Sequence, residues 1–279
     1  MTYNVGRQGM LRLVLNGGKK TTISEQFIQA PYHIQRAIHC DDTMQDMAHL
    51  YMMSSSGGIL GNDSHAIRVT LKDKARARLM TQGATRIYDT QDGTATQGIS
   101  ITLEQDSYLE FLPDITIPYK NSRYEQSVDI VCHQSATMIY TETLSPGRRA
   151  FGESFDYTLY KNVVSAKSDE GAWILHDAAL IEPARRSVQK YGIMGLYDTL
   201  CTVYILAPGS IVPRMYDGVN DAIRHQNDIL GGASIIHDKA GIIVRILSNK
   251  TETIQRVIDR IVHVVRYYRF SPVALRGGA

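Results

Sequence analysis

The chain has 279 residues, of which 43% are hydrophobic and 21% are charged, ordinary proportions for a folded protein with a sizeable core. Its 30 basic and 28 acidic residues nearly cancel and form no long block of one sign, which argues against a nucleic-acid partner. The sequence has neither an apolar run of roughly 20 residues, as a membrane span requires, nor the apolar segment of a secretory signal. Three scattered cysteines fit a reducing compartment. We therefore expect a cytoplasmic protein without a membrane partner.

Residues 1–212 have the pattern of many short strands. Leu11, Leu13 and Leu15 share one face of an alternating segment, and residues 99–103 and 108–112 repeat the pattern. Glycine, proline, asparagine and aspartate recur as turn residues roughly every ten to fifteen positions. This spacing predicts a mainly β fold, either a sandwich, a barrel or a β-helix-like stack. No sequence repeat selects among these forms.

The remainder, residues 213–270, predicts a C-terminal layer of two helices. Residues 213–230 have helical spacing of apolar side chains and end at two glycines. Residues 234–247 predict a β-hairpin, and the apolar stripe from Ile254 to Val265 predicts a second helix that packs on the sheet. No linker of disordered composition separates the two parts, so we expect one domain over residues 1–279.

Catalytic motifs are missing. The sequence has no GxSxG elbow, no P-loop and no GxGxxG loop, and its nine histidines form no HExxH or HxH pair. One compact group of donors, residues 39–42 (His-Cys-Asp-Asp), offers nitrogen, sulfur and oxygen to a borderline metal. Four consecutive side chains converge poorly on one ion, so a turn at a strand end is the preferred interpretation. These absences predict a protein that is not an enzyme.

The most distinctive stretch is residues 54–88, SSSGGILGNDSHAIRVTLKDKARARLMTQGATRIY. Its glycine-rich turn and small-residue corner resemble the signature region of the urease accessory protein family UreD, named UreH in some species. Further similar segments follow in the same order, at residues 109–124, 141–155 and 173–180. The similarity spans roughly residues 30–270. Asn62 departs from the usual glycine, but asparagine also tolerates a positive φ.

The resemblance implies a function in urease maturation. Proteins of this family are scaffolds that bind the urease apoprotein and UreF, which in turn recruits the GTPase UreG. Nickel is thought to pass through an internal tunnel to the urease active site. The resemblance therefore implies no permanently bound cofactor, only nickel in transit through sites that admit and release the ion.

The same resemblance implies the candidate site residues. Four acidic residues match the family pattern as metal-transit candidates: Asp63, Glu142, Glu153 and Asp177. Four others belong to the signature region and would border the tunnel or shape it: Gly58, Gly61, Thr85 and Arg86.

Each carboxylate also has a structural interpretation. Asp63 can close a turn by accepting bonds from nearby backbone N–H groups. Glu142 can face solvent from an alternating strand, Glu153 can pair with Arg148 or Arg149, and Asp177 can cap a turn.

A different class of function is also open, a β-sandwich ligand-binding module that uses aromatic platforms such as Tyr119, Tyr124 and Trp173. A hydrolase is a third alternative, although no spacing unites its serine, histidine and aspartate residues.

Overall fold

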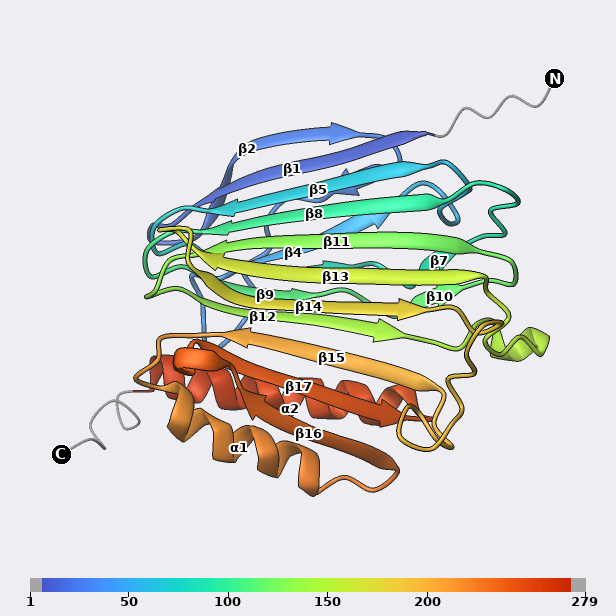
Figure 1. Ribbon diagram of the computed structural model, residues 1–279. Coiled ribbons are helices and arrows are strands. Elements are labelled where there is room, and N and C mark those ends of the chain that lie inside the picture. Colours follow the sequence, from blue (N-terminus) through green and yellow to red (C-terminus); the bar gives the residue numbers. More distant parts are fainter. Residues whose placement is uncertain (1–6, 272–279) are drawn as a thin grey trace.

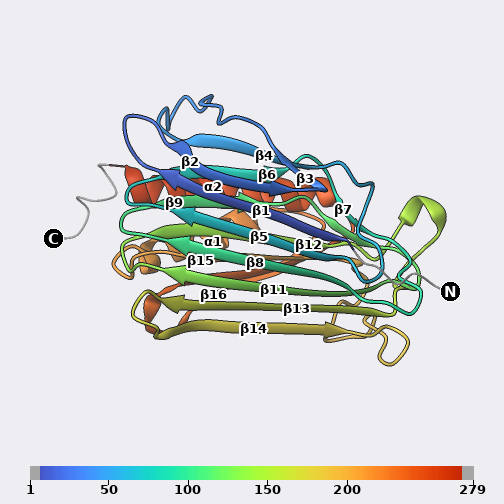
Figure 2. The ribbon, with the colours of Figure 1, turned by 90° about the horizontal axis from the view of Figure 1, so that it is seen from above.

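The computed structural model describes residues 7–271 and shows a β-solenoid of about four turns, in which each turn contributes a strand to each of two facing sheets (Figures 1 and 2). The prediction of a mainly β fold is confirmed, and among the forms left open the chain adopts the β-helix-like stack. The strands of the first sheet, in spatial order, are β14 (Trp173–Ile181), β13 (Leu159–Ser168), β11 (Arg123–Cys132), β8 (Ala95–Leu103), β5 (Ser64–Leu71), β1 (Gln8–Asn16) and β2 (Thr22–Gln29).

Parallel pairing defines the solenoid. Strands β1, β5, β8, β11 and β13 pair in parallel without a register shift, and antiparallel β2 and β14 flank them at the two edges. The central strands of the second sheet are parallel as well: β4 (Ala48–Ser54), β6 (Arg76–Thr81), β9 (Tyr108–Leu112) and β12 (Thr137–Leu144). Because register is kept, side chains one turn apart stack in rows between the sheets.

Short strands and an antiparallel extension complete the second sheet. At one edge β3 (Tyr32–Ile34) pairs with β4, and β7 (Thr85–Ile87) and β10 (Thr116–Pro118) pair beside β12. Beyond β12 the sheet continues with antiparallel β15 (Thr199–Leu206), β17 (Gly241–Ser248) and β16 (Ile229–Ile235). Two 3-10 turns, Arg149–Phe151 and His237–Lys239, lie in the connections.

Alternation along the strands places apolar rows in the interior, as the sequence predicts. Leu11, Ile67 and Ile99 occupy one row at the same level of neighbouring strands, and all three are buried. Apolar burial of this kind contributes about 25 cal/mol per Å² and is the main source of stability here. The polar residues described below interrupt this interior, so their burial requires an explanation.

The two helices cover the outer face of the antiparallel extension (Figure 1). The C-terminal helix α2 (Thr251–Phe270) buries the predicted apolar stripe against β15 and β17, which confirms that interpretation. Helix α1 (Val212–Arg224) packs against α2 so closely that a Cβ at Gly218 would lie 2.9 Å from Val264.

The predicted end of the first helix is wrong. Helix α1 stops at Arg224, and Gly231 and Gly232 lie inside edge strand β16 rather than at a helix terminus. Strand β16 starts at Ile229, before the predicted hairpin at residues 234–247, and pairs with β17 along its whole length. The glycine pair fits the strand because a Cβ at Gly231 would lie 2.9 Å from the carbonyl oxygen of Arg245 and 3.2 Å from Ile223 of α1.

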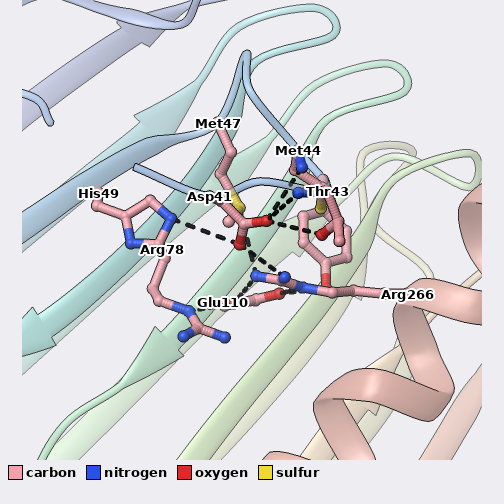
Figure 3. Close-up of polar contacts among 9 residues, drawn as sticks. Asp41, Thr43, Met44, Met47, His49, Arg78, Glu110 and Arg266 are labelled. Atoms are coloured by element: carbon pink, nitrogen blue, oxygen red, sulfur yellow. Dashed lines mark hydrogen bonds and ion pairs between the residues drawn. The ribbon is translucent and has the colours of Figure 1, made fainter. Parts of the chain in front are cut away.

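An ion-pair cluster fixes α2 to the solenoid and to the segment before β4 (Figure 3). Arg266 of α2 donates to Glu110, which is fully buried, and to Asp41 at 2.7 Å, while Arg78 pairs with Glu110 from the neighbouring strand. Asp41 also accepts bonds from Thr43. Residues 39–41 are irregular and lead into a bend at 42–43, and Asp41 is occupied by bonds from Thr43, Met44 and Arg266.

Candidate functional site

Two cavities lie inside the solenoid and meet at one carboxylate. The first has a volume of about 340 Å³ and is lined by residues of both sheets together with the turn at residues 56–59. The second, of about 450 Å³, lies where the first sheet ends at β14 and the second continues into β15 and β17. Glu142 of β12 and Tyr160 of β13 line both cavities.

Glu142 is held by donors from both sheets. Its Oε1 accepts from Gln126 Nε2 at 2.6 Å and from the Tyr140 hydroxyl at 2.7 Å, and its Oε2 accepts from Asn162 Nδ2. Burial nonetheless raises the pKa of Glu142 to about 7, against the lowering effect of these bonds. The carboxyl is thus poised between its neutral and ionised forms near neutral pH. Its remaining accessible surface opens onto the cavities.

A row of polar side chains crosses the interior of the first sheet. His65 pairs in register with Gln97, Gln97 with Gln126, and Gln126 with Asn162, on strands β5, β8, β11 and β13. Sequence reasoning missed these four residues. Each is unremarkable alone, and only the parallel register places them at one level.

Hydrogen bonds connect the row from Gln97 to Asn162, whereas His65 Nε2 has no partner. Gln97 Nε2 donates to the Tyr32 hydroxyl at 2.9 Å, and the Tyr124 hydroxyl lies 2.9 Å from the amide oxygens of both Gln97 and Gln126. Gln126 Nε2 lies 3.1 Å from Asn162 Oδ1. Polar atoms therefore extend without a break from the first cavity to Glu142, which faces the second.

The second cavity contains Asp177, in the middle of β14. Its carboxylate accepts from the Tyr204 hydroxyl at 2.9 Å and from Arg245 Nη2 at 2.7 Å. The rings of Tyr204 and Tyr140 stack with centroids 5.9 Å apart. Tyr140 donates to Glu142 and Tyr204 donates to Asp177, so the stacked tyrosines connect the two carboxylates. Within residues 7–271, no group of three histidine, cysteine, aspartate or glutamate residues is arranged to hold a metal ion.

The structure separates the four predicted carboxylates into two pairs. Glu142 and Asp177 line cavities, so neither the solvent-facing interpretation of Glu142 nor the turn-capping interpretation of Asp177 is correct. Asp63 closes a turn, accepting from Leu60 N at 2.9 Å and Arg7 N at 2.8 Å. Glu153 forms a double ion pair with Arg148. The lining of the two cavities includes neither Asp63 nor Glu153.

The signature residues lie around the first cavity. Gly58, Thr85 and Arg86 line it, and a Cβ at Gly58 would lie 2.7 Å from the Arg86 carbonyl oxygen. Gly61 does not line it. It packs on the backbone of Thr90, where a side chain has no room. The glycine-rich turn thus allows two backbone segments to approach closely at the mouth of the cavity.

The aromatic residues suggested as a ligand platform do not form one. Tyr124 is fully buried and hydrogen-bonded in the polar row. Tyr119 lies under the Arg148 guanidinium, and Trp173 lies at the edge of the solenoid beneath Lys167. No helix in the described part of the chain is long and apolar enough to cross a membrane.

Comparisons with known proteins identify the family of the chain. The profile of the UreD urease accessory protein family matches residues 7–275. The urease accessory protein UreD of Cenarchaeum symbiosum is 36% identical over 262 residues, covering 94% of this chain and 92% of that protein. UreD 2 of Brucella ovis is 31% identical, covering 95% of this chain and 89% of its own, and UreD of Photorhabdus laumondii is 29% identical over 251 residues.

The chain therefore belongs to the UreD urease accessory protein family. Members of this family are non-catalytic chaperones that take part in urease maturation and the assembly of its nickel centre. They work within urease accessory complexes.

Proposed function

We propose that this chain conducts nickel through its two cavities to the urease apoprotein, as a scaffold in the cytoplasm. The observation that carries this proposal is the shared position of Glu142, because one carboxylate reaches both cavities. A cation bound at Glu142 can therefore exchange with either cavity. Nickel is the cargo and is not a resident cofactor.

The chemistry of transit is stepwise ligand exchange. A divalent cation favours carboxylate oxygen, and a single carboxylate holds it weakly enough for release. To bind the ion, Glu142 exchanges the amide donors of Gln126 and Asn162 for the metal and gives up any proton it carries. The ion then reaches Asp177, whose present partner Arg245 must move aside. Arg245 is largely exposed, so this displacement is inexpensive.

The partners we propose are UreF, UreG through UreF, and the urease apoprotein. The surface supports docking to other proteins, because several large apolar side chains are exposed. Tyr191 is 99% exposed, Leu196 88% and Phe151 76%. Aromatic side chains are enriched in the cores of protein interfaces, so these residues are available for contacts with partners. They also lead us to expect poor solubility of the isolated chain.

The test is nickel delivery by variants of the two cavity carboxylates. We expect Glu142→Gln and Asp177→Asn to lower the nickel content of urease matured with UreF and UreG, while all partners still co-purify. The matched control is Glu125→Gln, on the outer face of β11 beside Lys161. Unchanged nickel content in both cavity variants would refute transit through the cavities.

Asp63→Ala and Glu153→Ala examine the wider set of carboxylates. Both residues hold loops through backbone N–H groups, so we propose that their loss acts on the shape of the scaffold. The expected result is weaker co-purification of partners together with lower nickel in urease. Nickel loss with the complex intact would instead place them on the path of the metal.

A further inference from the structure

His65 occupies an unusual position in the first cavity. It lies on β5 at the end of the polar row, beside Gly9, and is only 5% exposed. A Cβ at Gly9 would come within 3.3 Å of His65 Nε2 and closer still to Pro31, so only glycine fits beside the ring. The ring also packs edge-on against Tyr32, with centroids 5.4 Å apart.

The Nε2 atom of His65 is buried and has no hydrogen-bond partner. The large majority of buried polar atoms in proteins have a hydrogen-bond partner, so one without a partner requires an explanation. The neighbouring residues of the row do satisfy their own amides. Packing against Tyr32 accounts for the ring of His65 but leaves its Nε2 without a partner.

His65 is also distinguished by its donor type. It is the one imidazole in the described lining of either cavity, where the other strong donors are oxygen atoms such as those of Asp114 and Glu142. Burial lowers the pKa of His65, which favours the neutral form that binds metals. Imidazole suits nickel, copper and zinc, while magnesium and calcium prefer oxygen.

We propose that His65 coordinates nickel in the first cavity and gives this cavity its preference for borderline transition metals over magnesium and calcium. The inference rests on the proposed function, because it assigns a selectivity site within the same route. From His65 the ion continues along the amide oxygens of Gln97 and Gln126 to Glu142.

The variant His65→Gln tests the assignment. Glutamine continues the row of amides, keeps a similar volume and offers oxygen in place of nitrogen. The control is His49→Gln, which removes another buried histidine whose Nε2 forms no hydrogen bond, but which lies beside Asp41 and outside both cavities. Both variants are made in the full-length chain carrying a solubility fusion.

The first readout is equilibrium dialysis against Ni²⁺ in a large excess of Mg²⁺. We expect the wild-type chain and His49→Gln to retain nickel equally. His65→Gln should bind it at least roughly tenfold more weakly, the scale on which even outer-shell changes act. Equal binding by His65→Gln and the wild type would overturn the assignment.

The second readout does not depend on whether the variant folds. X-ray absorption at the nickel edge of the loaded wild-type chain should show scattering from one imidazole, and its absence would overturn the assignment. Delivery assays separate this inference from the proposed function. If Glu142→Gln blocks nickel delivery but the His65→Gln chain prefers nickel over magnesium as strongly as the wild type does, the transit route is supported and the role of His65 is refuted. If Glu142→Gln and Asp177→Asn both deliver nickel normally, the proposed function itself falls.

Discussion

Replacing Glu142 by glutamine should change how stability depends on pH. In the folded protein, burial raises the pKa of this carboxyl to about 7, from an ordinary value of 4.5. Below pH 4.5 the group is protonated in both the folded and unfolded chain, so it contributes no pH dependence. As pH rises from 4.5 to 7, only the unfolded chain loses the proton, and folding becomes progressively less favourable. Above pH 7 the full cost is present.

The size of this cost follows from the shift. One pKa unit corresponds to about 1.4 kcal/mol, so the shift of Glu142 costs up to roughly 3 kcal/mol at pH 8. Glutamine cannot ionise and removes the cost. The stability of Glu142→Gln relative to the wild type should therefore increase between pH 5 and pH 8, by as much as roughly 6–12 °C in melting temperature.

The assay is thermal unfolding of both proteins at several pH values, with Glu125→Gln as a control for the loss of a carboxylate on the outer surface. The quantity of interest is how the difference in melting temperature between Glu142→Gln and the wild type changes with pH. Imperfect packing of glutamine shifts this difference equally at every pH and therefore does not affect the result. A difference between Glu142→Gln and the wild type that stays constant from pH 5 to pH 8 would refute the reasoning. It would mean that the interior solvates the carboxylate as well as water does.

Two further changes test the scaffold around the cavities. Arg266→Met leaves the fully buried Glu110 with Arg78 as its only arginine partner, and breaking a buried pair costs roughly 3–5 kcal/mol. We expect a lower urea midpoint that Glu110→Gln partly restores in the double variant, and additive effects would contradict the pairing. Gly61→Ala pushes a Cβ into the Thr90 backbone and should cost about 1–3 kcal/mol. Gly83→Ala is the control, because no atom lies within 4 Å of a Cβ at Gly83, and it should have the melting temperature of the wild type. Equal melting temperatures of the two alanine variants would show that the backbone at Gly61 shifts to accommodate the methyl group.

Much of the fold can be predicted from local patterns. Alternation at Leu11, Leu13 and Leu15 indicates a strand with one buried face, and the stripe from Ile254 to Val265 indicates a helix on a sheet, as the structure confirms. Both signals depend only on neighbouring residues. Gly231 and Gly232 were misinterpreted because paired glycines fit a helix end as well as an edge strand, and only the packing of β16 on β17 decides between them.

The candidate site was only partly predictable because it depends on register between distant strands. The family pattern gives equal weight to all four carboxylates. The sequence allows Asp63 to close a turn and Glu153 to pair with Arg148, but only the three-dimensional structure decides which carboxylates line a cavity. The polar row recurs at intervals of roughly 30 residues, a period typical of solenoids. No repeated sequence marks it, because histidine, glutamine and asparagine share little beyond polarity.

The parallel register of the first sheet sets a step length inside the molecule. Neighbouring strands in a sheet lie about 4.8 Å apart, so His65, Gln97, Gln126 and Asn162 are spaced like rungs at that interval. Neighbouring donors along the proposed route are one strand spacing apart, so the length of that route is set by the number of coils in the solenoid. Inserting or deleting one coil would change it by a single fixed increment, without altering either end.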